Sequence, residues 1–287
     1  MVDTTPPRRV RPPAVAGSFY PEEPSALRSM VEACLAQARQ ARGTRGGAPR
    51  PETPPSSRPK AVIAPHAGYI FSGPIAGSAY GAVSDGLEGI ERVVLLGPSH
   101  FVPFAGLALP RAEAFQTPLG LVPVDAEARR AILRAAHVVT GDAPHAREHS
   151  LEVQLPFLQV LLGDEVSVLP IVSGDATAPQ VTAALERVWG GDETLIIISS
   201  DLSHYLDYAR ARAVDAATAK SILACAAELD ADQACGHVAI NGLLCAARQR
   251  HLNVRLLDLR NSGDTQPDRS RVVGYGAFAV YEGPVRQ

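Results

Sequence analysis

Long apolar runs, cysteine pairs and an excess of basic residues are all missing from this chain of 287 residues. No apolar stretch approaches the roughly 20 residues that a membrane-spanning helix requires. The formal net charge of −3 argues against general nucleic-acid binding. The N-terminal stretch MVDTTPPRRVRPP carries arginines but no apolar core, so it is not a secretory signal. These absences predict a cytoplasmic protein whose partners include neither a membrane nor a nucleic acid.

Several well-defined catalytic motifs are missing as well. The turn GPSHF lacks the closing glycine of a GxSxG nucleophile elbow, so a serine hydrolase has little support. No GxxxxGK[ST] phosphate loop and no GxGxxG dinucleotide motif opens a turn between a strand and a helix. Nucleotide binding is therefore not expected.

The chain does contain three apolar runs, AVIAPHAGY, RVVLLGPSHF and TLIIISSDLSHY, that each end close to a histidine. The runs are rich in Val, Ile and Leu and are closed by turn residues, which is typical of strands buried on both faces of a parallel sheet. Ligands bind outside the carboxyl ends of such strands. We therefore expect His66, His100 and His204 to meet at one sheet edge and to form a metal site or an acid/base site.

Alternating strand and helix patterns predict a single α/β domain over residues 13–287, with three α/β/α layers around a mixed, mostly parallel sheet. A tail over residues 1–12 is expected to be disordered, and the Gly-, Pro- and Ser-rich stretch 40–59 to be a surface loop. Ser25 is a plausible cap for the first helix, and Pro156 should kink the fourth helix or mark its first turn. Strands are predicted at 60–64, 91–97, 105–110, 119–122, 165–171, 194–199, 253–259 and 272–281. Helices are predicted at 25–39, 73–83, 125–136, 148–162, 177–189, 208–228 and 235–250.

Two motifs place polar residues close to these histidines. In SSDLSHY, Asp201 and His204 are three positions apart and would share a face if the segment turned helically. Asp201 could then orient His204 or share a proton with it, or it could cap the next helix. In REHSLEVQ, Glu148 and His149 fall at a predicted helix start, where the helix dipole accounts for Glu148 but not for His149.

The other candidate ligands are cysteines, of which the chain has four. Cys34, Cys225 and Cys245 fall in apolar helical patterns, where buried free thiols are common. Cys235 differs because it lies at a break just before a predicted helix, and a helix N-terminus favours thiolate over thiol. Two further histidines, His137 and His251, are interpreted as structural or surface residues, and His145 as a loop residue rather than a ligand.

Six blocks, in this order along the chain, resemble the Memo family: PPAVAGSFYP, IAPHAGYIFSGPIAGSAY, LLGPSHF, EHSLEVQLPFLQ, SSDLSHY and VVGYGAFAVY. The likeness extends from about residue 12 to residue 281, which is nearly the whole chain. In prokaryotes the family includes the protein B component of the system called AmmeMemoRadiSam. The resemblance implies a fold similar to that of the class III extradiol dioxygenases, a three-layer α/β/α arrangement.

The resemblance also implies a metal site. In those dioxygenases two histidines and a glutamate hold a non-haem Fe(II), and in Memo-type proteins a cysteine stands in place of the glutamate. The matching positions here are His66 of APHAGY, His100 of GPSH and Cys235 of ACGHVAING. A thiolate is softer than a carboxylate and can itself be oxidised, so ring-cleavage activity does not follow from the shared fold.

The neighbours of this ligand set follow from the same motifs. Asp201 and His204 would be catalytic residues that handle protons, and His149 of the EHS segment would line the pocket. We expect a Memo-type metalloprotein that binds Fe(II), or else Cu or Zn, and performs redox or oxygen-dependent chemistry on a small molecule or peptide. Components of the AmmeMemoRadiSam system are expected functional partners. Two alternatives stay open: a non-catalytic binding or scaffold protein, and a dioxygenase that cleaves an aromatic ring.

Overall fold

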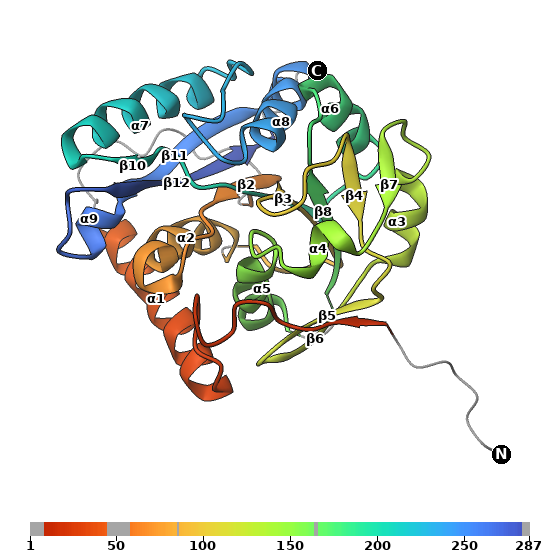
Figure 1. Cartoon of the computed structure of the whole chain (residues 1–287), viewed down its shortest axis with the longest axis horizontal. Helices are drawn as coiled ribbons and strands as arrows, with labels where there is room; N and C mark the ends of the chain where they lie inside the picture. Colours follow the sequence, from red (N-terminus) through yellow and green to blue (C-terminus); the bar gives the residue numbers. More distant parts are fainter. Residues whose placement is uncertain (1–8, 45–57, 85, 164–165, 283–287) are drawn as a thin grey trace.

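A nine-stranded mixed sheet forms the centre of the protein (Figure 1). The computed structural model describes residues 9–44, 58–84, 86–163 and 166–282. The strand order is β10-β12-β2-β9-β3-β8-β4-β7, and β11 also pairs with β12. The strands are β2 (Ala61–Ala64), β3 (Arg92–Pro98), β4 (Leu107–Leu109), β7 (Val138–Thr140), β8 (Ser167–Ser173), β9 (Thr194–Ser199), β10 (His204–Leu206), β11 (Asn253–Asn261) and β12 (Val272–Tyr281).

The middle of this sheet is parallel. Strands β2, β9, β3 and β8 run in the same direction, while β12 and β4 pair with the outer members of this group in the antiparallel sense. Every residue of β2 and β9 is buried, as expected for continuous apolar runs covered on both faces. In the parallel register, Ala64 at the end of β2 pairs with Ser199 at the end of β9.

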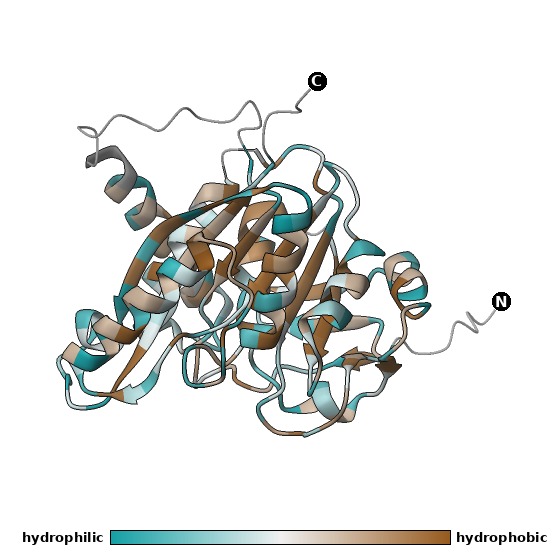
Figure 2. Ribbon diagram, turned by 90° about the horizontal axis from the view of Figure 1, so that it is seen from above, coloured by the Kyte–Doolittle hydropathy of each residue, from teal (hydrophilic) through white to brown (hydrophobic). Residues whose placement is uncertain are grey.

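Helices cover both faces of the sheet and enclose two apolar cores. One core packs α1, α2 and α5 against the sheet, and the other packs α3, α6, α7 and α8 against its opposite face. In Figure 2 the brown apolar strands of the sheet lie between helices that are mixed brown, white and teal. The predicted α/β/α arrangement is thereby confirmed. The helices are α1 (Pro24–Thr44), α2 (Tyr69–Val83), α3 (Ala126–Ile132), α4 (Ala143–Ala146), α5 (Leu155–Leu162), α6 (Ala178–Glu186), α7 (Tyr208–Leu223), α8 (His237–Gln249) and α9 (Ser262–Thr265).

A second, three-stranded sheet ties the N-terminal segment to the body of the protein. Its order is β1 (Val10–Arg11), β5 (Ala114–Thr117) and β6 (Gly120–Pro123). Figure 1 shows this first segment beginning beside β5 and then running past α5 toward α1. Two residues of the tail expected over 1–12 therefore lie in a strand, while residues 1–8 lie outside the described part of the chain. Among the helices in the described ranges, none has the length and apolarity needed to cross a membrane.

Glu152 anchors the same segment from the inside. Its carboxylate is fully buried and forms an ion pair with the buried guanidinium of Arg11. It also accepts hydrogen bonds from the Tyr20 hydroxyl at 2.5 Å and from the backbone N–H groups of Ala14 and Val15 at 2.8 and 3.0 Å. A buried carboxylate with this many donors keeps its charge satisfied away from water.

Some predicted helix ends differ from the structure. Ser25 does not cap α1, because the carboxylate of Glu23 accepts the backbone N–H groups of Ser25 and Ala26 at 3.0 and 2.7 Å. The expected loop 40–59 begins later, since α1 continues to Thr44, and residues 45–57 lie outside the described ranges. The helix expected from residue 148 begins only at Leu155, with Pro156 in its first turn.

Besides β1, three short strands were not predicted: β5, β7 and β10. Each has only three or four residues, and each is held by a partner that is distant in sequence or by an irregular pairing. Local apolar pattern carries little information about such strands, because their stability comes from the neighbouring strand.

Candidate metal centre

Two parallel strands deliver histidines to the same edge of the sheet. His66 follows β2 and His100 follows β3, and both strands flank β9. The carboxyl ends of these strands therefore lie side by side, and the two imidazole rings meet edge to face with their centroids 5.1 Å apart. The structure thus brings together the two histidines that the sequence places at strand ends.

A third imidazole, that of His149, completes a cluster. Its ring stacks on His100 with centroids 4.7 Å apart and lies 5.6 Å from His66, with Phe19 packed 4.7 Å away on another side. One ring nitrogen from each of the three histidines can be chosen so that all lie within 4.8 Å of one another. That spacing suits a single transition-metal ion, for which neutral imidazole is a common ligand.

His66 is held from several directions. Its backbone N–H donates to Asp201 Oδ1 at 2.8 Å, its Nδ1 lies 2.9 Å from Ser199 Oγ, and its Nε2 lies 3.2 Å from Cys235 Sγ. The side chain is only 2% exposed. Burial, with the neighbouring imidazoles adding to it, lowers the pKa of His66 well below its usual value. The ring is therefore neutral, which is the form that binds metals.

The carboxylate of Glu148 forms two hydrogen bonds with His100. The backbone N–H of His100 donates to Oε2 at 2.6 Å, and its Nδ1 lies 2.9 Å from Oε1. Burial alone would raise the pKa of Glu148, but the hydrogen bonds and charge of His100 lower it to about 2. The helix dipole does not explain Glu148, because α5 begins only at Leu155. The pairing of Glu148 with His100 explains its position instead. A carboxylate hydrogen-bonded to the ring nitrogen that does not bind the ion is typical of metal-binding histidines.

Cys235 contacts His66 but is not one of the three residues of this cluster. Its Sγ is 3.2 Å from His66 Nε2, 3.7 Å from the carbonyl oxygen of Asp201 and 3.8 Å from Ser200 Oγ. Burial, and then the charge of Asp201, raises the pKa of the thiol to about 12. The thiolate expected from the nearby helix start is therefore wrong for the metal-free protein, because desolvation outweighs the helix N-terminus.

The other three thiols differ from one another. Cys34 is buried, whereas Cys225 and Cys245 are half-buried, so the expected core positions are only partly observed. Cys225 lies beyond the end of α7, at a positive φ of 53°, and not within a helix as predicted. Within the described ranges, none of these three thiols forms a hydrogen bond with the imidazole cluster.

Asp201 is buried directly beside His66. It is 4% exposed, and its Oδ2 lies 4.0 Å from His66 Nε2. Burial raises its pKa to about 7, against the opposing effect of the His66 N–H and the charge of His100. Asp201 does not cap the following helix, since Asp207 accepts the Arg210 N–H at 3.0 Å there. The Asp201 side chain therefore contacts His66 and not the start of a helix.

His204 is not one of the three clustered histidines, so the expected trio of His66, His100 and His204 is not the one observed. His204 begins β10, so the helical turn that would align it with Asp201 is not formed. Burial lowers the pKa of His204, and the charge of His100 lowers it further. The charge of His204 likewise acts on His66. His204 therefore belongs to the electrostatic environment of the imidazole cluster although no hydrogen bond links it to those rings.

The histidines interpreted as structural stay apart from this site. His145 is a buried helical residue of α4 and not a loop residue, and its Nε2 lies 3.0 Å from the carbonyl oxygen of Ala108. His137 and His251 adopt positive φ values of 70° and 55°. Backbone geometry, rather than imidazole chemistry, is the feature that marks these two positions.

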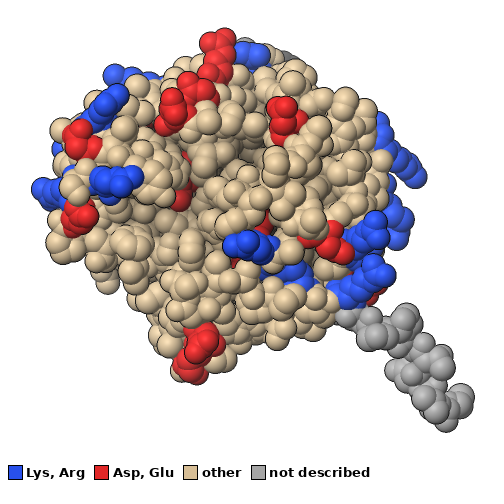
Figure 3. All heavy atoms as spheres, in the orientation of Figure 1, with Lys and Arg blue, Asp and Glu red and all other residues tan. Residues whose placement is uncertain are grey.

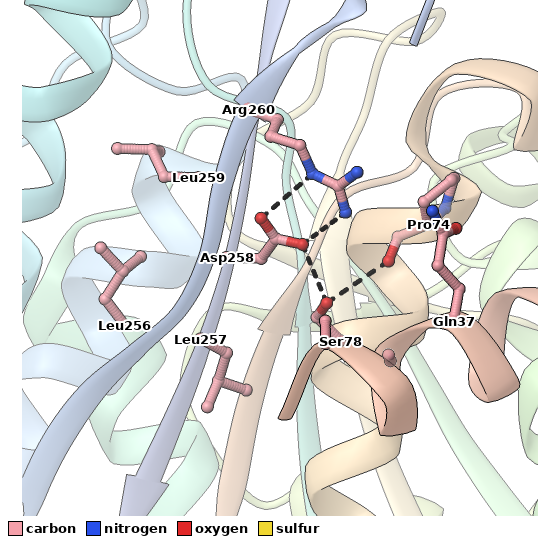
Figure 4. A pocket seen from close by; sticks show the side chains of 10 residues that line it. Gln37, Pro74, Ser78, Leu256, Leu257, Asp258, Leu259 and Arg260 are labelled. Atoms are coloured by element: carbon pink, nitrogen blue, oxygen red, sulfur yellow. Dashed lines mark hydrogen bonds and ion pairs between the residues drawn. The ribbon is translucent and has the colours of Figure 1, made fainter. Parts of the chain in front are cut away.

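A separate cavity of about 500 Å³ lies between β11 and the helices α1 and α2 (Figure 4). Its polar groups bind one another, because Ser78 donates to Asp258 Oδ2 at 2.9 Å and Arg260 donates to Asp258 Oδ1 at 3.1 Å. None of the predicted site residues lines it. This cavity therefore adds no ligand to the histidine site.

Sequence reasoning did not single out several residues that shape the site. Ser199 lies within SSDLSHY and Gln154 within EHSLEVQLPFLQ, but neither was assigned a role, and Phe19 was not connected with His149. The signal for Ser199 and Gln154 was their place inside motifs that also carry histidines. For Phe19 the sequence offers no comparable signal, because its contact depends on the docking of the N-terminal segment.

Comparison with known proteins identifies the family of the chain. A family model described as Memo-like protein matches residues 11–279. A MEMO1 family protein of Nitrosopumilus maritimus is 34% identical over 285 residues, covering 94% of this chain and 98% of that protein. A MEMO1 family protein of Methanothermobacter thermautotrophicus is 36% identical over 282 residues, covering 93% and 98%. One from Aquifex aeolicus is 34% identical over 282 residues, covering 93% and 97%. The chain belongs to the Memo family.

Proposed function

We propose that the protein binds one transition-metal ion through His66 and His100. The observation that carries this proposal is the meeting of three imidazoles whose ring nitrogens lie within 4.8 Å of one another. The ring environments support it, because Nδ1 of His66 faces Ser199 and Nδ1 of His100 faces Glu148. Both rings therefore keep Nε2 for a ligand, and each has the second contact that orients metal-binding histidines.

Two residues compete for the third ligand position. We favour Cys235, whose Sγ lies 3.2 Å from His66 Nε2 and which an ion would deprotonate on binding. His149 is the alternative, because its ring already belongs to the cluster of three imidazoles. If Cys235 is the ligand, His149 lines the pocket through its stack on His100. The two arrangements differ in whether the thiol becomes protected when metal is added.

We further propose Fe(II) as the preferred ion, with copper second and zinc third. Histidine nitrogen suits all three metals, and thiolate favours the softer ones. A redox-active ion would supply electron transfer, including transfer to oxygen. The chain itself would hold protons at the Asp201 carboxyl and the His204 ring, and Glu148 would keep the His100 ring oriented. These assignments make Asp201 and His204 the candidate catalytic residues.

A small molecule or peptide is the proposed ligand of this centre. Figure 3 shows acidic and basic side chains interspersed with uncharged residues over one face of the described molecule. Such a face does not favour a polyanion. The proposed setting is the cytoplasm, with components of the AmmeMemoRadiSam system as functional partners.

Purification without oxygen followed by elemental analysis tests this function. We expect one ion per chain, and a protein that binds none of Fe(II), copper or zinc under reducing conditions would refute the proposal. Oxygen consumption then distinguishes an enzyme from a binding or scaffold protein. Catechol cleavage should be poor, because a thiolate takes the place of the carboxylate that ring-cleaving dioxygenases use. Efficient ring opening would favour the dioxygenase alternative instead.

A further inference from the structure

A series of buried polar groups, linked by hydrogen bonds, leads to Nδ1 of His66. Apart from His66, none of these groups belongs to the proposed ligand set. The series begins at Tyr80 of α2, whose hydroxyl donates to Gln154 Oε1 at 2.9 Å. Gln154 Nε2 reaches the carbonyl oxygen of Pro65 at 3.0 Å and Ser199 Oγ at 2.8 Å. Ser199 Oγ lies 2.5 Å from the carbonyl oxygen of Ser150 and 2.9 Å from His66 Nδ1, which completes the series. Every side chain in it is at most 2% exposed, so water cannot replace these contacts.

The orientation of the Gln154 amide follows from its partners. A carbonyl oxygen can only accept hydrogen bonds, so the amide atom that faces Pro65 must be the nitrogen. The amide oxygen then accepts from Tyr80, and the second hydrogen of the nitrogen points to Ser199 Oγ. All hydrogen-bonding positions used by this amide are therefore consistent with one orientation.

The proton of the Ser199 hydroxyl is fixed by the same reasoning. Its hydroxyl has a single proton, and the Ser150 carbonyl oxygen at 2.5 Å can only accept it. Ser199 Oγ must then accept both of its other hydrogen bonds, one from Gln154 and one from His66 Nδ1. His66 therefore carries its ring proton on Nδ1. Its Nε2 is unprotonated, and the lone pair of this nitrogen faces Cys235 Sγ at 3.2 Å.

We propose that Ser199 is a positioning residue that holds His66 in the Nδ1–H tautomer, so that Nε2 is the atom that binds metal. The opposite tautomer would point a proton at the ion and would have to rearrange before binding. Partners of the second ring nitrogen commonly change metal affinity about 10- to 100-fold. The role in metal affinity rests on the proposed function, whereas the tautomer is a property of the metal-free protein.

The first test needs neither metal nor a variant. Two-dimensional ¹H–¹⁵N spectra of histidine-labelled, metal-free protein distinguish a protonated ring nitrogen from a free one, and His66→Ala identifies the signals of His66 by their loss. We expect a protonated Nδ1 and an unprotonated Nε2. A His66 ring protonated on Nε2 would overturn the proposal.

The second test separates positioning from general loss of stability. Ser199→Ala removes the acceptor of His66 Nδ1–H, and we expect the Nδ1–H signature to be lost and the affinity for Fe(II) to fall about 10- to 100-fold. Ser199→Thr keeps the hydroxyl and should retain both. The matched control is Ser173→Ala, since Ser173 is a buried serine at the end of β8 whose hydroxyl donates to Gly97 O at 3.1 Å. The Ser173→Ala protein should lose a comparable hydrogen bond. Its His66 should keep the Nδ1–H tautomer, and its affinity for Fe(II) should not change.

Each result decides between the explanations. A Ser199→Ala protein with the wild-type tautomer and affinity would overturn the proposal, as would an equal loss of affinity in Ser173→Ala. If the wild-type protein binds no metal at all, the proposed function fails, and the spectra of the wild-type and Ser199→Ala proteins still decide whether Ser199 sets the tautomer.

Discussion

The two oxygens of the Glu148 carboxylate meet two different donors of one residue, the backbone N–H of His100 at 2.6 Å and its Nδ1 at 2.9 Å. Main chain and ring of His100 are thereby fixed by a single side chain. The ring cannot turn about its χ angles without losing one hydrogen bond to a buried charge. Glu148 consequently determines which face of His100 is available to a ligand.

Replacing Glu148 by glutamine tests this relationship. The amide keeps the shape but removes the charge and can place a donor opposite the His100 N–H. We expect metal affinity to fall about 10- to 100-fold with little change in secondary structure. Competition with a metal-sensitive dye measures the affinity, and Glu228→Gln, at an exposed position, is the control. Unchanged affinity in the Glu148 variant would show that the carboxylate does not orient a ligand.

The histidines at the strand ends should be necessary for binding. We expect His66→Ala and His100→Ala to abolish binding of Fe(II), because each removes one of the few ligands of the ion. Elemental analysis after anaerobic loading measures the stoichiometry, and circular dichroism checks the fold. His251→Asn is the matched control, since asparagine tolerates the positive φ of this exposed residue. Retained binding in the double His66/His100 variant would disprove the ligand assignment.

Metal should protect one thiol. If Cys235 is a ligand, its alkylation should slow markedly when Fe(II) is present, because the bound sulfur cannot attack. Cys225 and Cys245, which are also half-buried, provide internal controls whose labelling should not change. Mass spectrometry of the digested protein gives each rate separately. Equal labelling of Cys235 with and without metal would assign the third position to His149.

His204 should matter for reactivity rather than for binding. We expect His204→Gln to retain metal affinity but to lose metal-dependent oxygen consumption, since a general acid or base contributes about 10²- to 10⁴-fold. An oxygen electrode measures the rate for wild-type and variant proteins loaded to the same metal content. The same rate in both would remove His204 from the proposed chemistry.

Asp215 should make the stability of the fold depend on pH. It is buried in α7, accepts the Ser203 N–H at 3.0 Å, and has a pKa that burial raises from 3.8 to about 6. Between these values the unfolded chain loses its proton before the folded protein does, so stability falls as pH rises from about 4 to 6. Asp215→Asn keeps an acceptor but cannot ionise. It should be more stable than the wild type above pH 6, by about 3 kcal/mol at most.

Urea denaturation at several pH values measures this difference. The gain from Asp215→Asn should shrink as the pH falls and disappear below about pH 4, where both proteins carry an uncharged side chain at this position. A constant difference at all pH values would mean that the effect comes from packing against Gly274, whose backbone lies close to the carboxylate, and not from charge.

The sequence predicts the long elements of the fold well for a physical reason. Strand β9 was predicted with its observed ends at residues 194 and 199, and β12 at 272 and 281, because both are continuous apolar runs bounded by turn residues. The placement of His66 and His100 followed from the same runs. Apolar pattern and turn chemistry are local properties, so one sequence is enough to read them.

The contacts of the site are not local, and the sequence could not supply them. Ser199 lies beside His66 because β2 and β9 pair in parallel with Ala64 opposite Ser199, and a shift of one residue would turn that hydroxyl to the other face. Cys235 was expected to be ionised from its place before a helix. Its burial against Asp201 depends on how α8 packs and reverses that expectation.

The distance along the chain between His66 and Cys235, 169 positions, has a consequence for how the protein matures. A polypeptide emerging from the ribosome holds the first histidine long before the thiol has been synthesised. Contacts between such remote residues form late, since a large loop must close before they contribute stability. Unlike a zinc finger, which folds around its ion, this protein has two apolar cores that do not depend on metal. If the proposed site binds an ion, that ion would therefore be taken up after translation, by a domain that is already folded.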